Sequence, residues 1–157
     1  MADPFQSPLI ERDADLGSAR LIDQSHLAKW RIWEDVYDVE LGTARHRNPG
    51  LVVCVAPAEW LSVGDRPETG DVVDLTHVRA AIRISGQGAR KVLEHECALD
   101  LSDEMTPNGA AARTLVAGVA TEIVRDDQEG EPSYLLLMSR SFARSLWEAL
   151  EGAARFS

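Results

Sequence analysis

Two glycines, Gly86 and Gly88, lie where a strand-forming run gives way to a helix-forming run, the place where a phosphate-binding turn would lie. The dinucleotide-binding fingerprint needs a third glycine, and Lys91 occupies that position. The segment that follows also lacks the compact parallel-strand pattern of a βαβ crossover. We therefore interpret the two glycines as a tight turn at the beginning of a helix, in preference to a nucleotide site.

The run Glu94-His95-Glu96-Cys97 has the composition of a metal site. Side chains two residues apart on a helix point to nearly opposite sides, whereas helical zinc pairs use i, i+4 spacing. The sequence contains no CxxC and no HxxxH. We expect His95 to be solvated and Cys97 to be a core thiol, and we predict no metal site and no cofactor site in this chain.

Asp74, Thr76 and His77 are close enough in sequence to suggest a catalytic triad, but no GxSxG nucleophile turn accompanies them. Asp74 is more simply a residue that accepts backbone hydrogen bonds at a strand end. His26 and His46 lie in polar stretches with no acidic or thiol partner at a useful spacing. We predict no acid–base pair and no catalytic residue from the sequence.

The unit that would position these residues spans Asp71–Asp103. In the run Val78–Ile84, apolar residues alternate with polar ones, which predicts a half-buried strand with Arg79 and Arg83 on its solvated face. After the Gly86–Gly88 turn the period changes to that of a helix, with one apolar stripe formed by Ala89, Val92, Leu93 and Cys97.

The rest of the chain supplies further strands and a second helix. Strands are predicted over 28–33, over 51–55, over 59–63, over 133–138, and over 110–125 as one long strand or a bent pair around Gly118. Residues 41–48 are interpreted as a polar connector. A helix is predicted over 140–155, with Ser139 as N-cap. Its apolar stripe comprises Phe142, Leu146, Trp147, Leu150 and Ala153 or Ala154. The predicted class is α+β, with a mainly antiparallel sheet and two or more helices.

Length and charge narrow the function. The 157 residues suffice for one domain, which we place at 19–157, after a polar segment at 1–18 that we expect to be an extended or disordered arm. A net charge of −10 argues against a nucleic-acid partner, because phosphates need clustered Lys and Arg. No run approaches a membrane span, and the first residues are unlike a secretory signal. With only Cys54 and Cys97, a disulfide scaffold is excluded and a cytoplasmic location is expected.

Four residues are candidates for a partner interface. Trp30 and Trp33 fall on opposite faces of a predicted strand, which is difficult to bury in so short a chain. Arg140 and Arg144 stand i, i+4 at the beginning of the last helix, where the helix dipole disfavours positive charge. In one interpretation, packing of the apolar stripe outweighs the unfavourable position of the two arginines. In the other, an acidic group of another subunit neutralises them.

Four segments in a fixed order resemble the γ subunit of heterotetrameric sarcosine oxidase, over about Leu51–Phe156. They read APAEWLSVG, VVDLTHVRAAIRISGQGARKVLEHECALDLS, AARTLVAGVATEIV and YLLLMSRSFARSLWEALEGAA. The combination RSFARSLWEAL is the most specific of these marks. The middle segment is also similar to the N-terminal folate-binding fold of glycine-cleavage aminomethyltransferases, and residues 1–39 match poorly.

This resemblance implies a non-catalytic subunit of a flavoenzyme that oxidatively demethylates sarcosine or a related N-methyl amino acid. In such complexes an α subunit carries NAD and a tetrahydrofolate site, a β subunit carries FAD and covalent FMN, and a δ subunit binds zinc. The one-carbon unit passes to tetrahydrofolate. Two other classes stay open: a stand-alone small-molecule, folate-like binding domain, and a one-carbon transfer enzyme, although such enzymes are normally more than twice as long.

Overall fold

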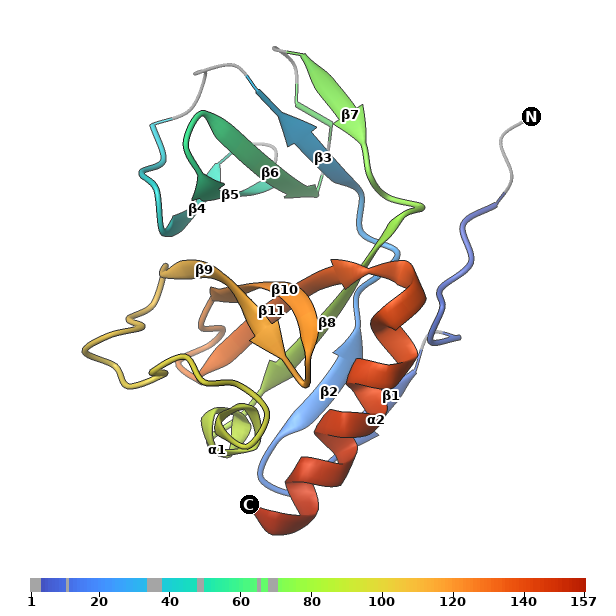
Figure 1. The fold of residues 1–157 in the computed structure, drawn as a ribbon, viewed down its shortest axis with the longest axis vertical. Coiled ribbons are helices and arrows are strands. Elements are labelled where there is room, and N and C mark those ends of the chain that lie inside the picture. Colours follow the sequence, from blue (N-terminus) through green and yellow to red (C-terminus); the bar gives the residue numbers. More distant parts are fainter. Residues whose placement is uncertain (1–3, 11, 34–37, 48–49, 65, 68–70) are drawn as a thin grey trace.

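The chain folds into two antiparallel sheets that pack face to face, with two helices on the outer face of the larger sheet (Figure 1). The structure is a computed structural model and describes residues 4–10, 12–33, 38–47, 50–64, 66–67 and 71–157. This arrangement is α+β and mainly antiparallel, as the sequence predicts. In the described chain no helix is long and apolar enough to cross a membrane.

The larger sheet, called here the large sheet, has the strand order β1-β2-β8-β11-β10-β9. Its strands are β1 (Asp13–Asp15), β2 (Arg20–Asp23), β8 (Arg79–Ser85), β9 (Ala111–Val116), β10 (Val119–Arg125) and β11 (Ser133–Ser139). The second sheet, called the small sheet, has the order β4-β5-β6-β3-β7. Its strands are β3 (Lys29–Ile32), β4 (Thr43–Arg47), β5 (Gly50–Ala56), β6 (Glu59–Gly64) and β7 (Val72–Asp74).

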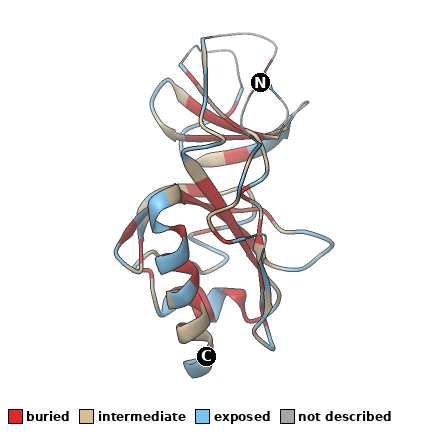
Figure 2. Cartoon of the chain, turned by 90° about the vertical axis from the view of Figure 1, so that its right-hand side faces the viewer, coloured by how far each residue is buried: buried red, intermediate tan, exposed pale blue. Residues whose placement is uncertain are grey.

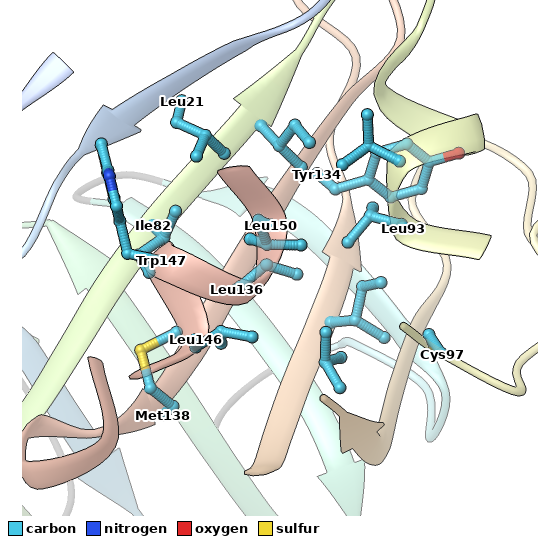
Figure 3. Packing of buried hydrophobic residues seen from close by; sticks show 14 of the residues in the cluster. Leu21, Ile82, Leu93, Cys97, Tyr134, Leu136, Met138, Leu146, Trp147 and Leu150 are labelled. Carbon is cyan, nitrogen blue, oxygen red and sulfur yellow. The ribbon is translucent and has the colours of Figure 1, made fainter. Parts of the chain in front are cut away.

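Helix α1 (Ala89–Glu94) and helix α2 (Ala143–Ala153) cover one face of the large sheet. A 3₁₀ turn, Arg140–Phe142, leads into α2, and a second, Ala154–Phe156, follows it. The burial colours show the buried face of α2 turned toward the sheet and its exposed face turned to solvent (Figure 2). Trp147 is fully buried in this layer, in the same apolar cluster as Leu21, Ile82, Leu136, Met138, Leu146 and Leu150 (Figure 3).

The opposite face of the large sheet packs on the small sheet, and this corrects one expectation. The sequence placed Arg79 and Arg83 on a solvated face of their strand. Strand β8 is instead central, its arginine-bearing face is covered by the small sheet, and Arg83 is only 4% exposed. A second apolar cluster fills this inter-sheet layer, formed by Ala44, Leu51, Val53, Leu61, Val63, Ala81, Ala111, Val124, Leu135 and Leu137.

Three local predictions also need correction. Residues 41–48 contain strand β4, paired with β5, because the β5 edge offers backbone partners to this polar stretch. Phe142 is 53% exposed and lies outside the core. The helical segment begins with a 3₁₀ turn that ends at Phe142, and this turn places the Phe142 side chain outside the apolar stripe of α2. Ser139 precedes that turn but makes no side-chain cap hydrogen bond. Strand β2 and strand β1 were not predicted.

The first residues pack on the domain as far as they are described. Strand β1 pairs antiparallel with β2, and Leu9 is 1% exposed within the helix-side core. The Ser7 hydroxyl donates to the Asp23 carboxylate, and the Ser7 Oγ accepts from the Leu9 N–H at 3.0 Å. Residues 1–18 are predicted to be an extended or disordered arm, and in the described part of this range Asp13–Asp15 is extended as a strand while Leu9 is buried in the core.

The Gly86–Gly88 turn is filled by the chain itself. Gly86 has a φ of +110°, and a Cβ on it would lie 2.7 Å from the Ser18 carbonyl oxygen. A Cβ on Gly88 would lie 2.0 Å from the Ser18 Oγ, and the Gly88 N–H donates to the Ser18 carbonyl at 2.9 Å. The glycines permit close packing of the β1–β2 turn, which confirms the structural interpretation of this motif.

Other predicted elements are found in place. The 110–125 run forms the hairpin β9–β10, which turns at Ala117-Gly118. Strands β5 and β11 match the predicted buried runs, and β6 matches the strand predicted over 59–63. Both cysteines are free and buried, and burial raises the pKa of the Cys54 thiol. The strand with tryptophans is β3, which places Trp30 on it and Trp33 immediately after it.

Candidate functional site

The four predicted interface residues lie in two separate places. Trp30 is half-buried with the Arg66 guanidinium 5.5 Å from its ring centre, and Trp33 is 47% exposed. Arg140 is half-buried with its guanidinium 5.7 Å from the Phe5 ring, whereas Arg144 is exposed on α2. Among the described residues, no hydrogen bond, ion pair or ring contact joins the tryptophans to the arginines.

The sequence motifs that suggested catalysis or metal binding have structural roles. The Asp74 Oδ1 accepts from the Thr76 N–H at 2.9 Å, and His77 packs on the Phe5 ring at 5.6 Å, so these residues form a turn as predicted. His95 is exposed and Cys97 is buried. Within the described ranges no three His, Cys, Asp or Glu side chains gather in a way that could hold a metal ion.

A charged chain of three residues crosses the inter-sheet layer at one end. The Arg83 Nη2 donates to the Asp126 Oδ2 at 3.1 Å, and the His46 Nε2 lies 2.7 Å from the Asp126 Oδ1. Arg83 comes from β8 and Asp126 follows β10, both in the large sheet, whereas His46 comes from β4 in the small sheet. Asp126 therefore joins a buried arginine to a histidine side chain that is 72% exposed.

Arg83 is held on every side. Its Nε donates to the Gln24 Oε1 at 2.9 Å, and its Nη1 donates to the Ser133 Oγ at 2.8 Å and to the Asp126 carbonyl at 3.2 Å. A planar guanidinium with fixed partners is a rigid support for a carboxylate. Arg83 therefore fixes the position of the Asp126 carboxylate, and this carboxylate in turn orients the imidazole ring of His46.

The exposed side of His46 borders an open cleft of about 570 Å³. One wall of the cleft is formed by β4 and the residues just before it, and the other wall by the 105–110 turn. The cleft extends to the end of β10. This volume falls within the range of small-molecule sites, roughly 300–1,000 Å³. Its walls are formed by Gly42, Thr43, Ala44, Arg45, His46, Arg47, Leu51, Met105, Pro107, Asn108, Gly109, Ala110, Arg125 and Asp126.

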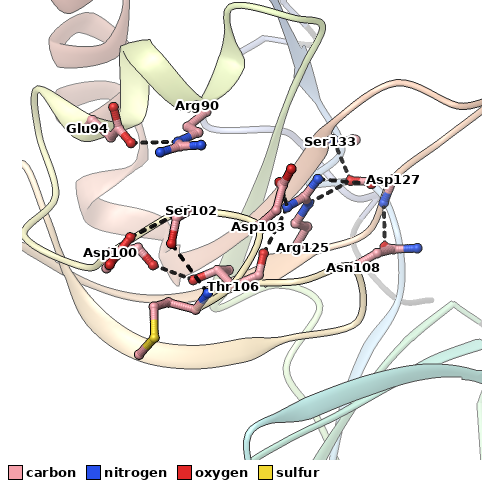
Figure 4. A network of polar contacts seen from close by, with 11 residues as sticks. Arg90, Glu94, Asp100, Ser102, Asp103, Thr106, Asn108, Arg125, Asp127 and Ser133 are labelled. Atoms are coloured by element: carbon pink, nitrogen blue, oxygen red, sulfur yellow. Dashed lines mark hydrogen bonds and ion pairs between the residues drawn. The ribbon is translucent and has the colours of Figure 1, made fainter.

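A second polar network fixes the wall opposite β4 (Figure 4). Arg125 grips Asp127 with two hydrogen bonds, Nε to Oδ1 at 3.0 Å and Nη2 to Oδ2 at 3.2 Å. Its Nη1 donates to the Asp103 carboxylate and, at 2.9 Å, to the Thr106 carbonyl. The hydrogen bonds that Arg125 donates to Asp127 and Asp103 raise the pKa of Arg125 above its ordinary value, so this arginine stays charged.

The same network orients Asn108. Its Oδ1 accepts from the Asp127 N–H at 2.9 Å, which leaves the amide N–H groups of Asn108 for another partner. Asn108 is exposed and borders the cleft. The cleft thus has an oriented imidazole on one wall and an oriented amide on the other.

A further charged cluster lies at the other end of the inter-sheet layer. Glu122 is 3% exposed and accepts from Arg79 and, at 3.3 Å, from Arg113. Arg31 Nε lies 3.0 Å from the Glu59 Oε1 nearby, although the geometry is not that of a good hydrogen bond. These residues line a smaller hollow of about 360 Å³. The charged side chains around this hollow pair with one another, so we assign them a structural role.

Lys29 is a buried cation near this layer. Its Nζ donates to the Ser25 carbonyl at 2.6 Å and to the Leu27 carbonyl at 2.8 Å, and the Phe5 ring lies 5.8 Å away. Burial lowers the pKa of Lys29 to about 8. The two carbonyls use two of its three donors, which gives the amine a structural role.

Sequence reasoning missed the His46–Asp126–Arg83 chain, because its members are 80 and 43 residues apart. One signal was present. Arg79 and Arg83 repeat at a spacing of four on β8, and Glu122 and Asp126 repeat at the same spacing along β10. Matching spacings on two strands that flank β11 predict two ion pairs on one sheet face.

Comparison with known proteins supports the fold. One chain of the heterotetrameric sarcosine oxidase from Corynebacterium sp. U-96, solved in complex with pyrrole 2-carboxylate, superposes with a TM-score of 0.80 at 17% identity. The match covers 97% of this chain and 95% of that one. The glycine cleavage system aminomethyltransferase T from Bartonella henselae gives 0.65 at 17% identity, over 86% of this chain and 46% of that one.

No protein-family model and no curated protein matches the sequence. The shared feature is therefore the fold, and the aminomethyltransferase-like fold implied by the sequence resemblance is confirmed. This chain spans a little less than half of the aminomethyltransferase.

Proposed function

We propose that this chain is a non-catalytic, γ-like assembly subunit of a heterotetrameric flavoenzyme that oxidatively demethylates sarcosine or a related N-methyl amino acid. The observation that carries the proposal is the reciprocal coverage, 97% of this chain and 95% of one chain of a heterotetrameric sarcosine oxidase. A chain that equals one subunit in extent and fold is well suited to the same place in an assembly. The aminomethyltransferase is matched over less than half its length.

The partners in this proposal are α, β and δ subunits. The α subunit would carry NAD and the tetrahydrofolate site that receives the one-carbon unit, the β subunit FAD and FMN, and the δ subunit zinc. This chain would contribute contact surface and no cofactor of its own. The substrate class and the cofactors rest on the family resemblance and on the fold.

Exposed apolar side chains next to the predicted interface residues support a docking role. Trp33 directly follows β3, whose Arg31 pairs with exposed Val73 on β7. Exposed Val78 accepts a backbone hydrogen bond from Arg140 at 3.0 Å, and exposed Phe142 lies two residues further on. Aromatic residues and arginines are enriched in protein interfaces, and large exposed apolar groups mark them.

The test is purification through a tag on this chain from its native host. We expect a yellow complex several times heavier than 17.2 kDa, with flavin absorbance that bleaches on addition of sarcosine or another N-methyl amino acid. Light scattering gives the mass and the visible spectrum reports the flavin. A colourless monomer or homodimer would contradict the proposal.

Interface variants refine the test. Reversal of charge at Arg140 and Arg144, and the separate change Trp33→Ser, should each weaken assembly more than they lower the stability of the isolated chain. Arg20→Glu on β2 is the matched control, since Arg20 is also exposed and, among the described residues, pairs only with Asp13. Arg140 contacts Phe5, so its replacement also disturbs packing within the chain. The single change Arg144→Glu avoids this contact and tests docking alone. Equal losses of assembly and stability would overturn these assignments.

A stand-alone small-molecule binding domain is the second candidate, and the cleft beside His46 is the observation that favours it. A colourless homodimer that binds folate in a titration would support this alternative.

A further inference from the structure

The cleft beside His46 has an unusual charge for this protein. The whole chain carries a net charge of −10. The residues that line the cleft include three arginines and one histidine, but only one carboxylate, Asp126. That carboxylate is already paired with buried Arg83, which is not part of the lining. Of the three arginines, Arg125 is already paired with Asp127 and Asp103, whereas Arg45 and Arg47 form no ion pair with a described residue. These two side chains therefore give the β4 side of the cleft a local positive charge that attracts anions.

The positive groups reach the cleft from both faces of β4. The pairing of His46 with Leu51 and of Ala44 with Val53 places these residues on the face turned toward the large sheet. Arg45 and Arg47 alternate to the other face, but β4 is the edge strand of the small sheet, and both residues still line the cleft. Arg47 donates only to the backbone carbonyls of His46 and Asp38 among the described residues.

The contact between His46 and Asp126 leaves one ring nitrogen of His46 without a partner among the described residues. The short contact with Asp126 fixes the ring through Nε2, so Nδ1 is the nitrogen left for a ligand. A doubly protonated imidazole donates from both ring nitrogens, so in that form Nδ1–H is a charged donor. Asn108 supplies neutral N–H donors from the opposite wall, because its oxygen is held by the Asp127 N–H.

The rest of the lining indicates an organic ligand. Ala44, Leu51 and Ala110 provide apolar surface, and the Met105 side chain stands exposed at the rim. A lone inorganic ion would leave most of the 570 Å³ empty. An apolar body that carries one planar anionic group would use both the walls and the donors.

We infer that this cleft binds a small organic carboxylate, with His46 as the charged hydrogen-bond donor, Asn108 as a second donor, and Arg45 and Arg47 as the source of long-range attraction. This inference does not depend on the proposed assembly role. The carboxylate has two possible sources, a free metabolite-sized molecule or an acidic side chain or terminus of a partner subunit, and the same donors would hold either.

Calorimetric titration of the full chain with benzoate tests the inference, with benzamide as the uncharged analogue of the same shape. The buffer should be slightly acidic and of low ionic strength, where imidazoles are largely protonated and charge is weakly screened. We expect saturable binding of benzoate and none of benzamide. His46→Gln should weaken benzoate binding about tenfold or more, since it removes a charge-assisted hydrogen bond.

Two further variants separate the site from general effects. Arg45→Gln combined with Arg47→Gln should weaken binding by a few-fold at low salt and by less at high salt, because these charges act at a distance. His95→Gln, at an exposed histidine outside the cleft, should leave binding unchanged. Circular dichroism confirms that each variant is folded. Equal binding of benzamide, or unchanged binding by His46→Gln, would overturn the inference.

Phenyl phosphate and the assembled complex complete the test. Binding of phenyl phosphate without any binding of benzoate would also overturn the assignment to carboxylates. If benzoate binds both the isolated chain and the assembled complex, the ligand is a free molecule. If benzoate binds the isolated chain alone, a carboxylate of a partner fills the cleft in the complex.

Discussion

The two faces of the large sheet are built by different chemistry. The face under α1 and α2 is apolar, with Trp147, Tyr134 and a group of aliphatic side chains in one continuous core. The face under the small sheet has an apolar centre, but buried charges stand at both of its ends, Arg79 with Glu122 and Arg83 with Asp126. The helix side therefore holds the fold by burial, whereas the inter-sheet side combines burial with specific pairing.

This difference bears on the ligand cleft proposed above. Close-packed apolar layers tolerate little change in volume, whereas buried ion pairs add little net stability and position groups accurately. The cleft beside His46 is formed where one of these pairs reaches the surface. The helix side is the stable support, and the ends of the inter-sheet layer are the places where ligand chemistry is available.

The largest effect is expected on the helix side. Trp147→Ala should lower the free energy of unfolding by about 3–5 kcal/mol, because it removes a fully buried ring and leaves a cavity. Phe142→Ala is the matched control, an aromatic residue of the same predicted stripe that is half-exposed, and it should cost about 0.5 kcal/mol or less. Urea denaturation measures both. Similar costs for the two would contradict the assignment of the core.

The inter-sheet side should respond in a non-additive manner. Asp126→Leu leaves Arg83 buried without its carboxylate and should cost about 3 kcal/mol. The double variant Arg83→Met with Asp126→Leu should be closer to the wild type than the sum of the single changes, because neither charge is then stranded. A double-mutant cycle from urea midpoints gives the coupling energy. Simple additivity would show that the pair is not coupled.

These two layers also explain what sequence could predict. The helix-side face of β8 is predictable from apolar alternation, β11 from a continuous apolar run, and α2 from a stripe that includes Leu146, Trp147 and Leu150. The burial of the inter-sheet face of β8 cannot be predicted from such a pattern. Arg79 and Arg83 look solvated, because nothing local to β8 announces that a second sheet will cover them.

The cleft depends on tertiary contacts of the same kind. Residues 41–48 contain too few apolar residues to predict a strand, yet β4 forms because the β5 edge supplies backbone partners. Only this pairing brings His46 to Asp126, 80 residues later. The predicted interface residues, Trp30, Trp33, Arg140 and Arg144, stay predictions until assembly is measured.

A smaller effect, set by pH, is expected at Lys29. Burial lowers its pKa in the folded chain to about 8, below the ordinary value of 10.5. Between these values the unfolded chain keeps a proton that the folded chain has lost, so stability should rise with pH across this interval. The rise should be at most about 3 kcal/mol.

The comparison with Lys29→Met isolates this contribution, because cysteine and tyrosine titrate in the same interval in both proteins. Urea denaturation at a series of alkaline pH values should show a smaller increase, or a larger decrease, in the stability of Lys29→Met than in that of the wild type. Parallel curves would mean that the Lys29 amine titrates normally and is not buried as described.

The smallest effect should come from an ion pair of the same chemistry as Arg83 with Asp126, but on the surface. Arg90 Nε and Glu94 Oε1 lie 2.7 Å apart on α1, and both side chains are more than two-fifths exposed. Water solvates both charges whether or not they pair, so Glu94→Gln should change the urea midpoint far less than Asp126→Leu does. Salt adds the decisive contrast. Raising the salt to about 1 M should abolish the small effect at Glu94, because the Debye length falls to about 3 Å, but should leave most of the cost at Asp126. A salt-sensitive Asp126 variant would mean that water reaches the Arg83 pair, and the inter-sheet layer would then resemble the surface more than the core.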